Sequence, residues 1–240
     1  IYKGDCVEVV KSLPDDSVGL SVFSPPFADL YAYSDSERDM GNCRSYPEFF
    51  RHFGFLVDEL ARVLLPGRIV AVHCMDLPEF KSKAGFIGLK DFPGDLVRCF
   101  KKRGFVFHGR HCIWKDPLIA AVRTRSLTLA HKQIVKDSSQ CATGIPDQIL
   151  AFRKPGDNPE PIEHPKGLTE YCGAREIPRD LSRFYVDWMP PKTNKRSHWI
   201  WRQYASPVWT DIRQGRVLPY QKGREKDDQN RVVKSTRFEL

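Results

Sequence analysis

The sequence predicts an α/β fold built around a mainly parallel sheet. Short apolar runs of strand type alternate along the chain with longer segments in which apolar residues recur at helical spacing. Such alternation is typical of parallel sheets, because each helix crosses from one strand to the next. At 240 residues, the chain is long enough for one core with an appendage and short for two independent domains.

The individual elements have their own sequence signals. Tyr2–Leu13 has the pattern of a short strand end, a turn at Gly4-Asp5 and a helix, and Val18–Phe23 is an apolar run typical of a buried strand. Helical spacing over Tyr46–Leu65 predicts a long helix that stops at Pro66-Gly67. The later signals predict strands over Arg68–Cys74, Phe105–Trp114 and Asp147–Arg153, and helices over Asp95–Lys102 and around Ser126–Lys136.

The composition changes after Lys154. A connection rich in Pro, Gly and Asp is followed by a segment with little periodicity, which holds four of the five tryptophans among basic residues. We therefore expect a first unit over residues 1–155 and a basic, irregular, Trp-rich extension over residues 156–240.

The positive charge is concentrated in this extension. The chain has a formal charge of +8, and the stretch from Arg175 to Leu240 holds 15 basic and 8 acidic residues, a net of +7. A basic surface of this kind favours a polyanionic partner such as a nucleic acid.

Other bulk features exclude some classes of protein. The apolar stretches are too short to cross a bilayer, and no signal-peptide pattern opens the chain, so we expect a cytoplasmic protein. The seven cysteines include no C-x-x-C pair, so neither disulfides nor a structural zinc site are expected.

Ser24-Pro25-Pro26-Phe27 stands where the predicted strand Val18–Phe23 ends. In open α/β sheets the ligand crevice lies at the carboxyl ends of the strands, so this motif is well placed for chemistry. The Ser24 hydroxyl and the Pro25 carbonyl can accept hydrogen bonds from an exocyclic amino group, which favours a tetrahedral nitrogen with an available lone pair. The consecutive prolines fix the backbone and bring no competing N–H group.

The motif belongs to a longer pattern, G-D-C-x-E-x-x-x-S-L-P-D-x-S-V-x-L-x-x-x-S-P-P-F, from Gly4 to Phe27. This pattern resembles the opening of the amino-group DNA methyltransferases whose catalytic motif precedes the cofactor loop, and the resemblance extends over about 155 residues. It implies the catalytic half of a Rossmann-like methyltransferase sheet, S-adenosylmethionine as cofactor, DNA as substrate and a place in a restriction-modification system. It also implies that Ser24, Pro25, Pro26 and Phe27 are catalytic.

The resemblance further indicates how the substrate is held. A serine in the first motif position favours cytosine N4 over adenine N6 as the methylated atom. An amino group inside a duplex cannot be reached, so the base must be flipped out, and Phe27 can stack on it. Asp5 is expected to bind cofactor, although an N-cap of the following helix is an equal alternative.

One family feature is missing. No Gly-x-Gly loop occurs in the 240 residues, and the nearest candidate, Ala84–Gly88, lies between the wrong elements. We therefore expect a fragment or a chain that depends on a missing cofactor-binding segment or a partner chain. The alternative function is a DNA-binding module that is catalytically incomplete.

Aromatic and basic residues are the candidates for DNA contact. Trp114 and Lys115 end a strand beside the expected crevice, although a Trp at the core edge with a solvated Lys is an alternative. In the extension, the candidates are Lys192, Lys195, Arg196, Trp199, Trp201 and Arg202, which offer ring faces and phosphate partners. A tryptophan-rich mini-core with a basic surface, and an RNA or protein-amide substrate, remain open.

Three further patterns allow other interpretations. His73, Cys74 and Asp76 are types of metal ligand, but a fourth ligand is lacking, so a packed strand end is favoured. Ser24 with His73 or His111 is a conceivable hydrolase pair, but no G-x-S-x-G elbow surrounds the serine. A polar aromatic loop that either closes over the base or is an ordinary loop contains Asp29, Tyr31, Tyr33, Ser34 and Asp35.

Overall fold

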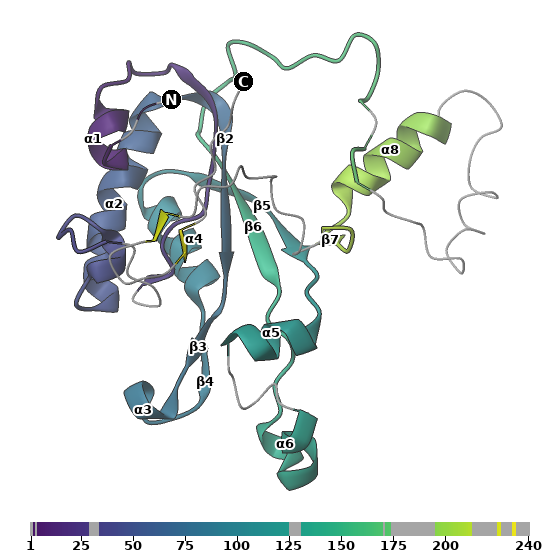
Figure 1. Cartoon of the computed structure of the whole chain (residues 1–240). Helices are drawn as coiled ribbons and strands as arrows, with labels where there is room; N and C mark the ends of the chain where they lie inside the picture. Colours follow the sequence, from purple (N-terminus) through teal and green to yellow (C-terminus); the bar gives the residue numbers. More distant parts are fainter. Residues whose placement is uncertain are drawn as a thin grey trace.

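Figure 1 shows the computed structural model of the chain. The structure describes residues 2, 4–28, 34–124, 131–169, 171–173, 195–212, 225–226 and 232–233. The fold below is that of these residues.

A five-stranded sheet with the order β1-β2-β6-β5-β7 forms the centre of the fold (Figure 1). The pairs β1·β2 and β5·β7 are parallel, whereas β6 is antiparallel to both β2 and β5. Four of these five strands therefore run in one direction, and the prediction of an α/β fold with a mainly parallel sheet is confirmed. The strands are β1 (Val18–Phe23), β2 (Leu64–Met75), β5 (Val106–Ile113), β6 (Asp147–Arg153) and β7 (Val208–Trp209).

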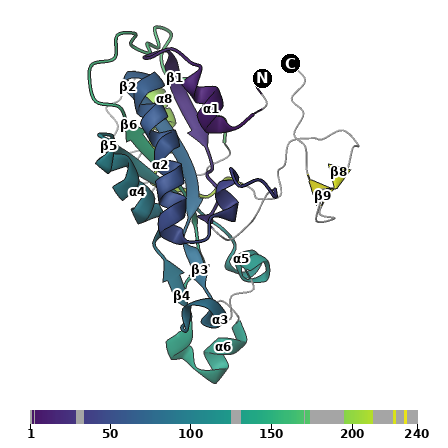
Figure 2. The same ribbon diagram turned by 90° about the vertical axis from the view of Figure 1, so that its left-hand side faces the viewer.

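Three helices cover one face of this sheet (Figures 1 and 2). They are α1 (Cys6–Lys11), α2 (Tyr46–Val63) and α4 (Phe92–Lys102). The side chain of Ser45 caps α2 by accepting a hydrogen bond from the Glu48 N–H, and the side chain of Asp91 caps α4 in the same way at the Gly94 N–H. Their apolar faces supply the core because phenylalanines and leucines recur at helical spacing on the buried side.

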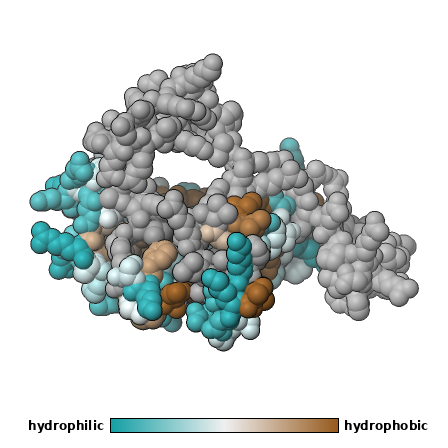
Figure 3. All heavy atoms as spheres, turned by 60° about the horizontal axis from the view of Figure 1, so that its bottom comes forward, coloured by the Kyte–Doolittle hydropathy of each residue, from teal (hydrophilic) through white to brown (hydrophobic). Residues whose placement is uncertain are grey.

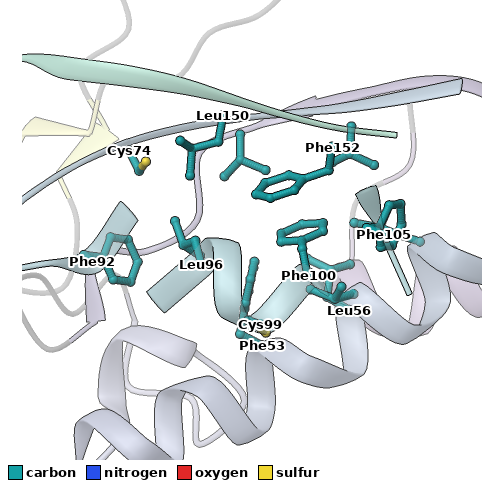
Figure 4. Packing of buried hydrophobic residues seen from close by; sticks show 14 of the residues in the cluster. Phe53, Leu56, Cys74, Phe92, Leu96, Cys99, Phe100, Phe105, Leu150 and Phe152 are labelled. Atoms are coloured by element: carbon teal, nitrogen blue, oxygen red, sulfur yellow. The ribbon is translucent and has the colours of Figure 1, made fainter. Parts of the chain in front are cut away.

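The core lies between this helix layer and the sheet, and is rich in phenylalanine (Figure 4). Phe100 of α4 stacks on Phe152 of β6 with ring centroids 4.0 Å apart and an interplanar angle of 4°. Phe100 also meets Phe53 of α2 and Phe105 edge to face. A few rings therefore join both long helices to the middle of the sheet.

The helix α2 ends two residues earlier than its sequence pattern predicts. The structure has its last residue at Val63, and β2 begins at Leu64 and runs through Pro66 and Gly67. The reason is tertiary pairing, because the N–H groups of Asp16 and Ser17 donate to the carbonyl oxygens of Arg62 and Val63 and draw the chain into the sheet. An irregularity in the β1·β2 register then accommodates the Pro-Gly pair.

Smaller elements extend from the end of the sheet at which β2 terminates (Figures 1 and 2). A hairpin forms between β3 (Leu77–Glu79) and β4 (Gly88–Lys90), with α3 (Lys81–Ala84) in its connection. Viewed from this end, the molecule shows separate apolar patches among hydrophilic residues (Figure 3). The other short elements are η2 (Met40–Asn42), α5 (Pro117–Thr124), α6 (His131–Lys136) and η4 (Ser138–Gln140).

Part of the basic extension packs against the sheet. Helix α8 (Lys195–Ala205) leads into β7, which pairs with the end of β5. Ile200 and Gln203 of α8 are buried. A separate two-stranded ladder joins β8 (Glu225–Lys226) and β9 (Val232–Val233). Among the residues described, no helix is long and apolar enough to span a bilayer.

The Phe100–Phe152 stack is a direct test of this core. We expect Phe100→Ala to lower the free energy of unfolding by about 3–5 kcal/mol, because it removes a fully buried ring and leaves a cavity. Phe55→Ala, on the exposed side of α2, is the matched control and should cost less than about 1 kcal/mol. Chemical denaturation of the chain measures both, and equal losses would show that the core is not organised around this stack.

Candidate active site

The ends of three strands bring Ser24, His73 and Asp147 to one place. In the parallel β1·β2 pair Phe23 is opposite Val72, so the next residues, Ser24 and His73, are neighbours. Because β6 is antiparallel, its first residue, Asp147, lies opposite Met75 near the end of β2. Sheet register alone therefore places a hydroxyl, an imidazole and a carboxylate at the same edge.

The motif Ser24–Phe27 begins where β1 stops pairing. Pro25 and Pro26 have no N–H to continue the ladder, so the strand ends at Phe23. Ser24 is exposed and Pro25 is buried, which anchors the turn and presents the hydroxyl to solvent. Ala28, which is 1% exposed, has φ of 49°, a left-handed conformation that a non-glycine residue rarely adopts. The surrounding packing thus fixes the backbone just after the motif.

Ser24 forms its contacts with His73. Ser24 Oγ lies 3.2 Å from His73 Nδ1 and 3.2 Å from the His73 carbonyl oxygen. The hydroxyl has one hydrogen, which it can donate to either of these two acceptors. Ser24 is therefore an oriented hydroxyl with lone pairs open to solvent.

Asp147 holds the other side of the imidazole. His73 Nε2 lies 3.3 Å from Asp147 Oδ2, and the Lys115 ammonium pairs with Asp147 Oδ1. The side chains of Asp147 and Lys115 are only 15% and 14% exposed. Burial by itself raises the pKa of Asp147, but the hydrogen bonds from His73 and Lys115 outweigh it and lower the pKa below its usual value. Asp147 is therefore a carboxylate at neutral pH.

Phe27 packs beside the same imidazole. Its ring centroid is 6.3 Å from that of His73 and 6.2 Å from that of Phe92, which it meets edge to face. The ring is half-buried against the core. Phe92 and the core therefore hold the ring in a defined orientation next to His73.

Asp5 lies on a cavity that it shares with the motif. A cavity of about 430 Å³ is lined by Asp5, by Ser24, Pro25 and Pro26, and by apolar side chains of α2. Asp5 also caps α1, because its Oδ1 accepts from the Val7 and Glu8 N–H groups at 2.9 and 3.3 Å. Its Oδ2 lies 3.9 Å from the Arg38 guanidinium. The N-cap role is therefore observed, and the same residue faces a cavity of the size that small molecules occupy.

The three candidate metal ligands at the end of β2, His73, Cys74 and Asp76, do not lie on one face of the strand. Cys74 is fully buried in the core, and burial raises the pKa of its thiol to about 12, whereas His73 lies on the opposite face with Ser24. Burial and the nearby Asp91 also raise the pKa of Asp76. Within the described ranges, no group of three His, Cys, Asp or Glu residues could hold a metal ion.

Ser24, His73 and Asp147 have the side chains of an acyl-transfer triad. Pro25 cannot supply the N–H after the serine that such enzymes use to stabilise an oxyanion. His111 is elsewhere, stacked on Trp209 with centroids 4.6 Å apart and its Nδ1 3.2 Å from the Ser206 carbonyl. Hydrolysis is therefore not favoured by this arrangement.

The candidate DNA-contact residues have different environments. Trp114 is 52% exposed, and its backbone N–H donates to the backbone carbonyl of Trp209. Lys115 turns inward to Asp147 and is not the solvated lysine of the alternative interpretation. Trp201 on α8 is 59% exposed. Arg202 follows it and is partly buried, with interaction partners of its own. The backbones of Lys195, Arg196 and Trp199 lie in α8, and Lys192 lies outside the described residues.

Two other candidate segments can be placed in part. Ala84–Gly88 lies in the β3–β4 connection, where Gly85 has φ of 81°, so it is a hairpin connection and not a strand-to-helix turn. In the polar aromatic loop, Ser34 donates to Asp39 through its N–H and hydroxyl groups. The residues Asp29, Tyr31 and Tyr33 lie outside the described part of the chain.

The structure adds Asp147 to the site, a residue that the sequence marks only as the first of a predicted strand. The signal that could have identified Asp147 is its place in the chain. The first residue of an antiparallel strand lies beside the carboxyl ends of the neighbouring strands, where the site is expected. His73 is named in the sequence only as a metal ligand or hydrolase partner. In the structure, His73 contacts Ser24 and so belongs to the site of the Ser24–Phe27 motif.

The Asp147 cluster predicts a pH-dependent contribution to stability. Because the folded-state pKa of Asp147 is lowered, the contribution is full at neutral pH and is lost as pH falls through that folded pKa. Asp147→Asn should therefore lower the free energy of unfolding by about 1–3 kcal/mol at pH 7 and by less in acid. The exposed Asp157→Asn is the control. Denaturation measured across pH checks this, and a loss at pH 7 that persists unchanged in acid would contradict it.

The chain is similar to known proteins in part of its sequence and in its fold. No family model matches the chain. The type II methyltransferase M.BamHI of Bacillus amyloliquefaciens is 33% identical over 82 residues, which are 34% of this chain and 18% of that protein. The chain thus matches less than a fifth of the length of this curated relative.

Two solved structures give the structural comparison. TTHA0409 of Thermus thermophilus, described as a DNA modification methylase in complex with S-adenosyl-L-methionine, matches with a TM-score of 0.50 and 20% identity, over 87% of this chain and 65% of that chain. The cytosine-N4-specific PvuII DNA methyltransferase matches with a TM-score of 0.45 and 18% identity, over 80% of this chain and 64% of that chain. The chain spans about two thirds of these structures, and the first match shows that it has the mixed α/β, Rossmann-like fold found in that methylase.

Proposed function

We propose that the chain is the catalytic part of an S-adenosylmethionine-dependent DNA methyltransferase that methylates an exocyclic amino group of a base. The observation that carries the proposal is the exposed Ser24 hydroxyl, which is oriented at the end of β1 on a cavity shared with Asp5. The similarity to M.BamHI over 82 residues and the fold shared with TTHA0409 support it.

The residues around the cavity fit the cofactor. Asp5 offers a carboxylate oxygen for the amine or hydroxyl donors of S-adenosylmethionine, and the apolar side chains of α2 offer surface for its less polar parts. The cofactor supplies an electrophilic methyl group when bound. Because Ser24, Pro25 and Pro26 line the same cavity, an amino nitrogen that contacts Ser24 would be close to that methyl group.

Ser24 can prepare the amino nitrogen for transfer. Its Oγ can accept one N–H bond of the base, and the Pro25 carbonyl is proposed to accept the other. These bonds favour a tetrahedral nitrogen, whose lone pair is no longer delocalised into the ring. The turn is preorganised by the two prolines and by the fixed backbone at Ala28.

Phe27 is proposed to hold a flipped base. An amino group inside a duplex cannot reach the Ser24 hydroxyl on this cavity, so the base must leave the stack, at a cost of a few kcal/mol. Stacking on Phe27 can return about 1–3 kcal/mol. The contact with Phe92 fixes the ring before a base arrives.

Cytosine N4 is proposed as the target in preference to adenine N6. The support is the serine in the first motif position, where this family often has Asp or Asn. A place in a restriction-modification system is proposed on the same resemblance.

The extension is proposed to bind DNA through its charge and its aromatic rings. Its stretch from Arg175 to Leu240 has a net charge of +7, against +8 for the whole chain. Trp201 presents an exposed ring on the α8 segment that also contains Lys195, Arg196 and Arg202. The proposed contacts further include Lys192, Trp199, Trp114 and Lys115. For Lys115 the buried pair with Asp147 favours a role at the site edge instead of a phosphate contact.

The edge strand β1 suggests where a cofactor-binding segment would pack. Leu20 and Val22 point away from the helix layer and are 60% and 66% exposed, so this edge strand leaves two large apolar side chains uncovered on one face of the sheet. We propose that a further α/β segment covers these side chains in the natural protein that contains this chain.

The alternative is a DNA-binding module that is catalytically incomplete. The lack of any Gly-x-Gly turn in the 240 residues favours it for this chain, whereas the oriented Ser24 favours catalysis. Cofactor affinity distinguishes the two.

The proposed function is tested by methyl transfer to DNA, with the modified nucleoside identified by mass spectrometry. In the natural protein that contains this chain, we expect N4-methylcytosine. Ser24→Ala should lower kcat about a hundredfold with little change in DNA affinity, because its hydroxyl acts as the nitrogen becomes tetrahedral. Phe27→Ala should weaken productive binding as well as rate, and Phe27→Tyr should keep much of the activity.

Phe55→Ala, on an exposed part of α2, serves as the control for these variants in single-turnover assays. A parental rate in Ser24→Ala, or unchanged rate and affinity in Phe27→Ala, would show that the motif is a structural turn. A methylated product other than an exocyclic amine would overturn the proposed reaction.

Calorimetry with S-adenosylmethionine separates enzyme from binding module. The isolated 240-residue chain should show little affinity, because it has Asp5 and the cavity but no glycine turn against which the cofactor packs. Micromolar binding that Asp5→Asn weakens would instead show that these 240 residues form a sufficient cofactor site.

A further inference from the structure

We propose that His73, held by Asp147, is a positioning residue that orients the Ser24 hydroxyl and accepts its proton during methyl transfer. The inference rests on the proposed function and deepens it. Its basis is the continuous contact from Ser24 Oγ to His73 Nδ1 at 3.2 Å and from His73 Nε2 to Asp147 Oδ2 at 3.3 Å.

Hydrogen-bond roles decide which nitrogen of His73 carries hydrogen. Asp147 is ionised and can only accept, so the imidazole nitrogen that faces it, Nε2, must carry the hydrogen. A neutral imidazole has one N–H, which leaves a lone pair on Nδ1. The Ser24 hydroxyl can then donate to Nδ1 in place of its other acceptor, the His73 carbonyl oxygen, which is also 3.2 Å away. Its own lone pairs remain open to an amino group of the substrate.

This arrangement gives a route for the proton that methylation must release. The lone pair of the amino nitrogen forms the new N–C bond, while the electron pair of the broken S–C bond stays on the sulfur, so the nitrogen becomes cationic. One N–H proton then passes to Ser24 Oγ as the Ser24 hydroxyl proton passes to His73 Nδ1. The products are a neutral methylamino group, an intact serine and an imidazolium paired with Asp147.

Lys115 limits how much charge the site accumulates. Its ammonium pairs with the second oxygen of Asp147 and also contacts the Met75 sulfur at 3.9 Å. After the proton transfer, Asp147 lies between two cations, which favours return of the proton to solvent from the partly exposed imidazole. The charged side chains next to the His73 imidazole on neighbouring elements, within the part of the chain that the structure describes, are Asp147 of β6 and, through Asp147, Lys115 just after β5.

The proposal predicts the effect of acid. An imidazolium donates from both nitrogens, so it occupies a lone pair of Ser24 Oγ and cannot accept its hydrogen. The positive charge also opposes the cationic nitrogen. Methyl transfer should therefore be slower from the imidazolium form of His73 than from its neutral form.

Imidazole ¹⁵N NMR on the 240-residue chain tests the geometry without cofactor or DNA. His73→Gln identifies the signals of His73, and His108→Gln, on an exposed part of β5, is the matched control. We expect hydrogen on Nε2 at neutral pH and a mixture of tautomers in Asp147→Asn. Hydrogen on Nδ1 in the parent chain, or an unchanged tautomer in Asp147→Asn, would overturn the proposal.

The pH profile of methyl transfer tests the role in the natural protein that contains this chain. His73→Gln should lower kcat about a hundredfold, leave the KM for DNA nearly unchanged and abolish the acidic limb of the profile. Asp147→Asn should be slower than Asp147→Glu, and His108→Gln should match the parent.

The outcomes separate this inference from the proposed function. If the parent methylates an amino group of DNA and His73→Gln keeps both the rate and the acidic limb, the role of His73 fails while the function stands. If the parent forms no methylated amine, the proposed function fails and the role of His73 in transfer fails with it, whatever tautomer the NMR shows.

Discussion

The antiparallel insertion of β6 between β2 and β5 is the constraint on which the candidate site depends. Because β6 runs against its neighbours, its first residue, Asp147, lies opposite Met75 and Ile113 at their carboxyl ends. A parallel β6 would place Arg153 there instead. The direction of one strand therefore decides whether the imidazole of His73 faces a carboxylate or a guanidinium.

Packing of the core fixes the side chains of the site as firmly as their own contacts do. Alternate residues of β2 and β6, including Cys74 and Phe152, enter the core and leave His73 and Asp147 on the opposite face. A slip of one residue would exchange the two sets and place apolar side chains at the site. The stack of Phe100 on Phe152 is therefore part of the reason that Asp147 reaches His73.

Local sequence patterns predicted most of the helices and strands. They failed where contacts between segments distant in sequence determine the structure. The bounds of β1 and β6 match the apolar runs, and the motif lies at the predicted strand end. The predicted end of α2 was wrong because the backbone N–H groups of Asp16 and Ser17 bond to carbonyl oxygens of its last turn. The contact between His73 and Asp147 spans 74 residues of sequence, and neither residue carries a local signal of its partner. Strand direction, which creates that contact, has no signature in the periodicity of either strand.

The neutral Ser24 suits a site that already contains a carboxylate. A carboxylate in place of Ser24 would contact His73, whose other ring nitrogen faces Asp147. Two carboxylates at such short range would each disfavour ionisation of the other. Serine avoids this conflict because it is uncharged, while His73 connects its hydroxyl to the charge of Asp147. The negative charge therefore acts through an imidazole and is also shared with Lys115. In our proposal, the amino nitrogen contacts the Ser24 hydroxyl and does not contact Asp147. Asp147 acts on the reaction by pairing with the imidazolium that forms when His73 accepts the Ser24 proton.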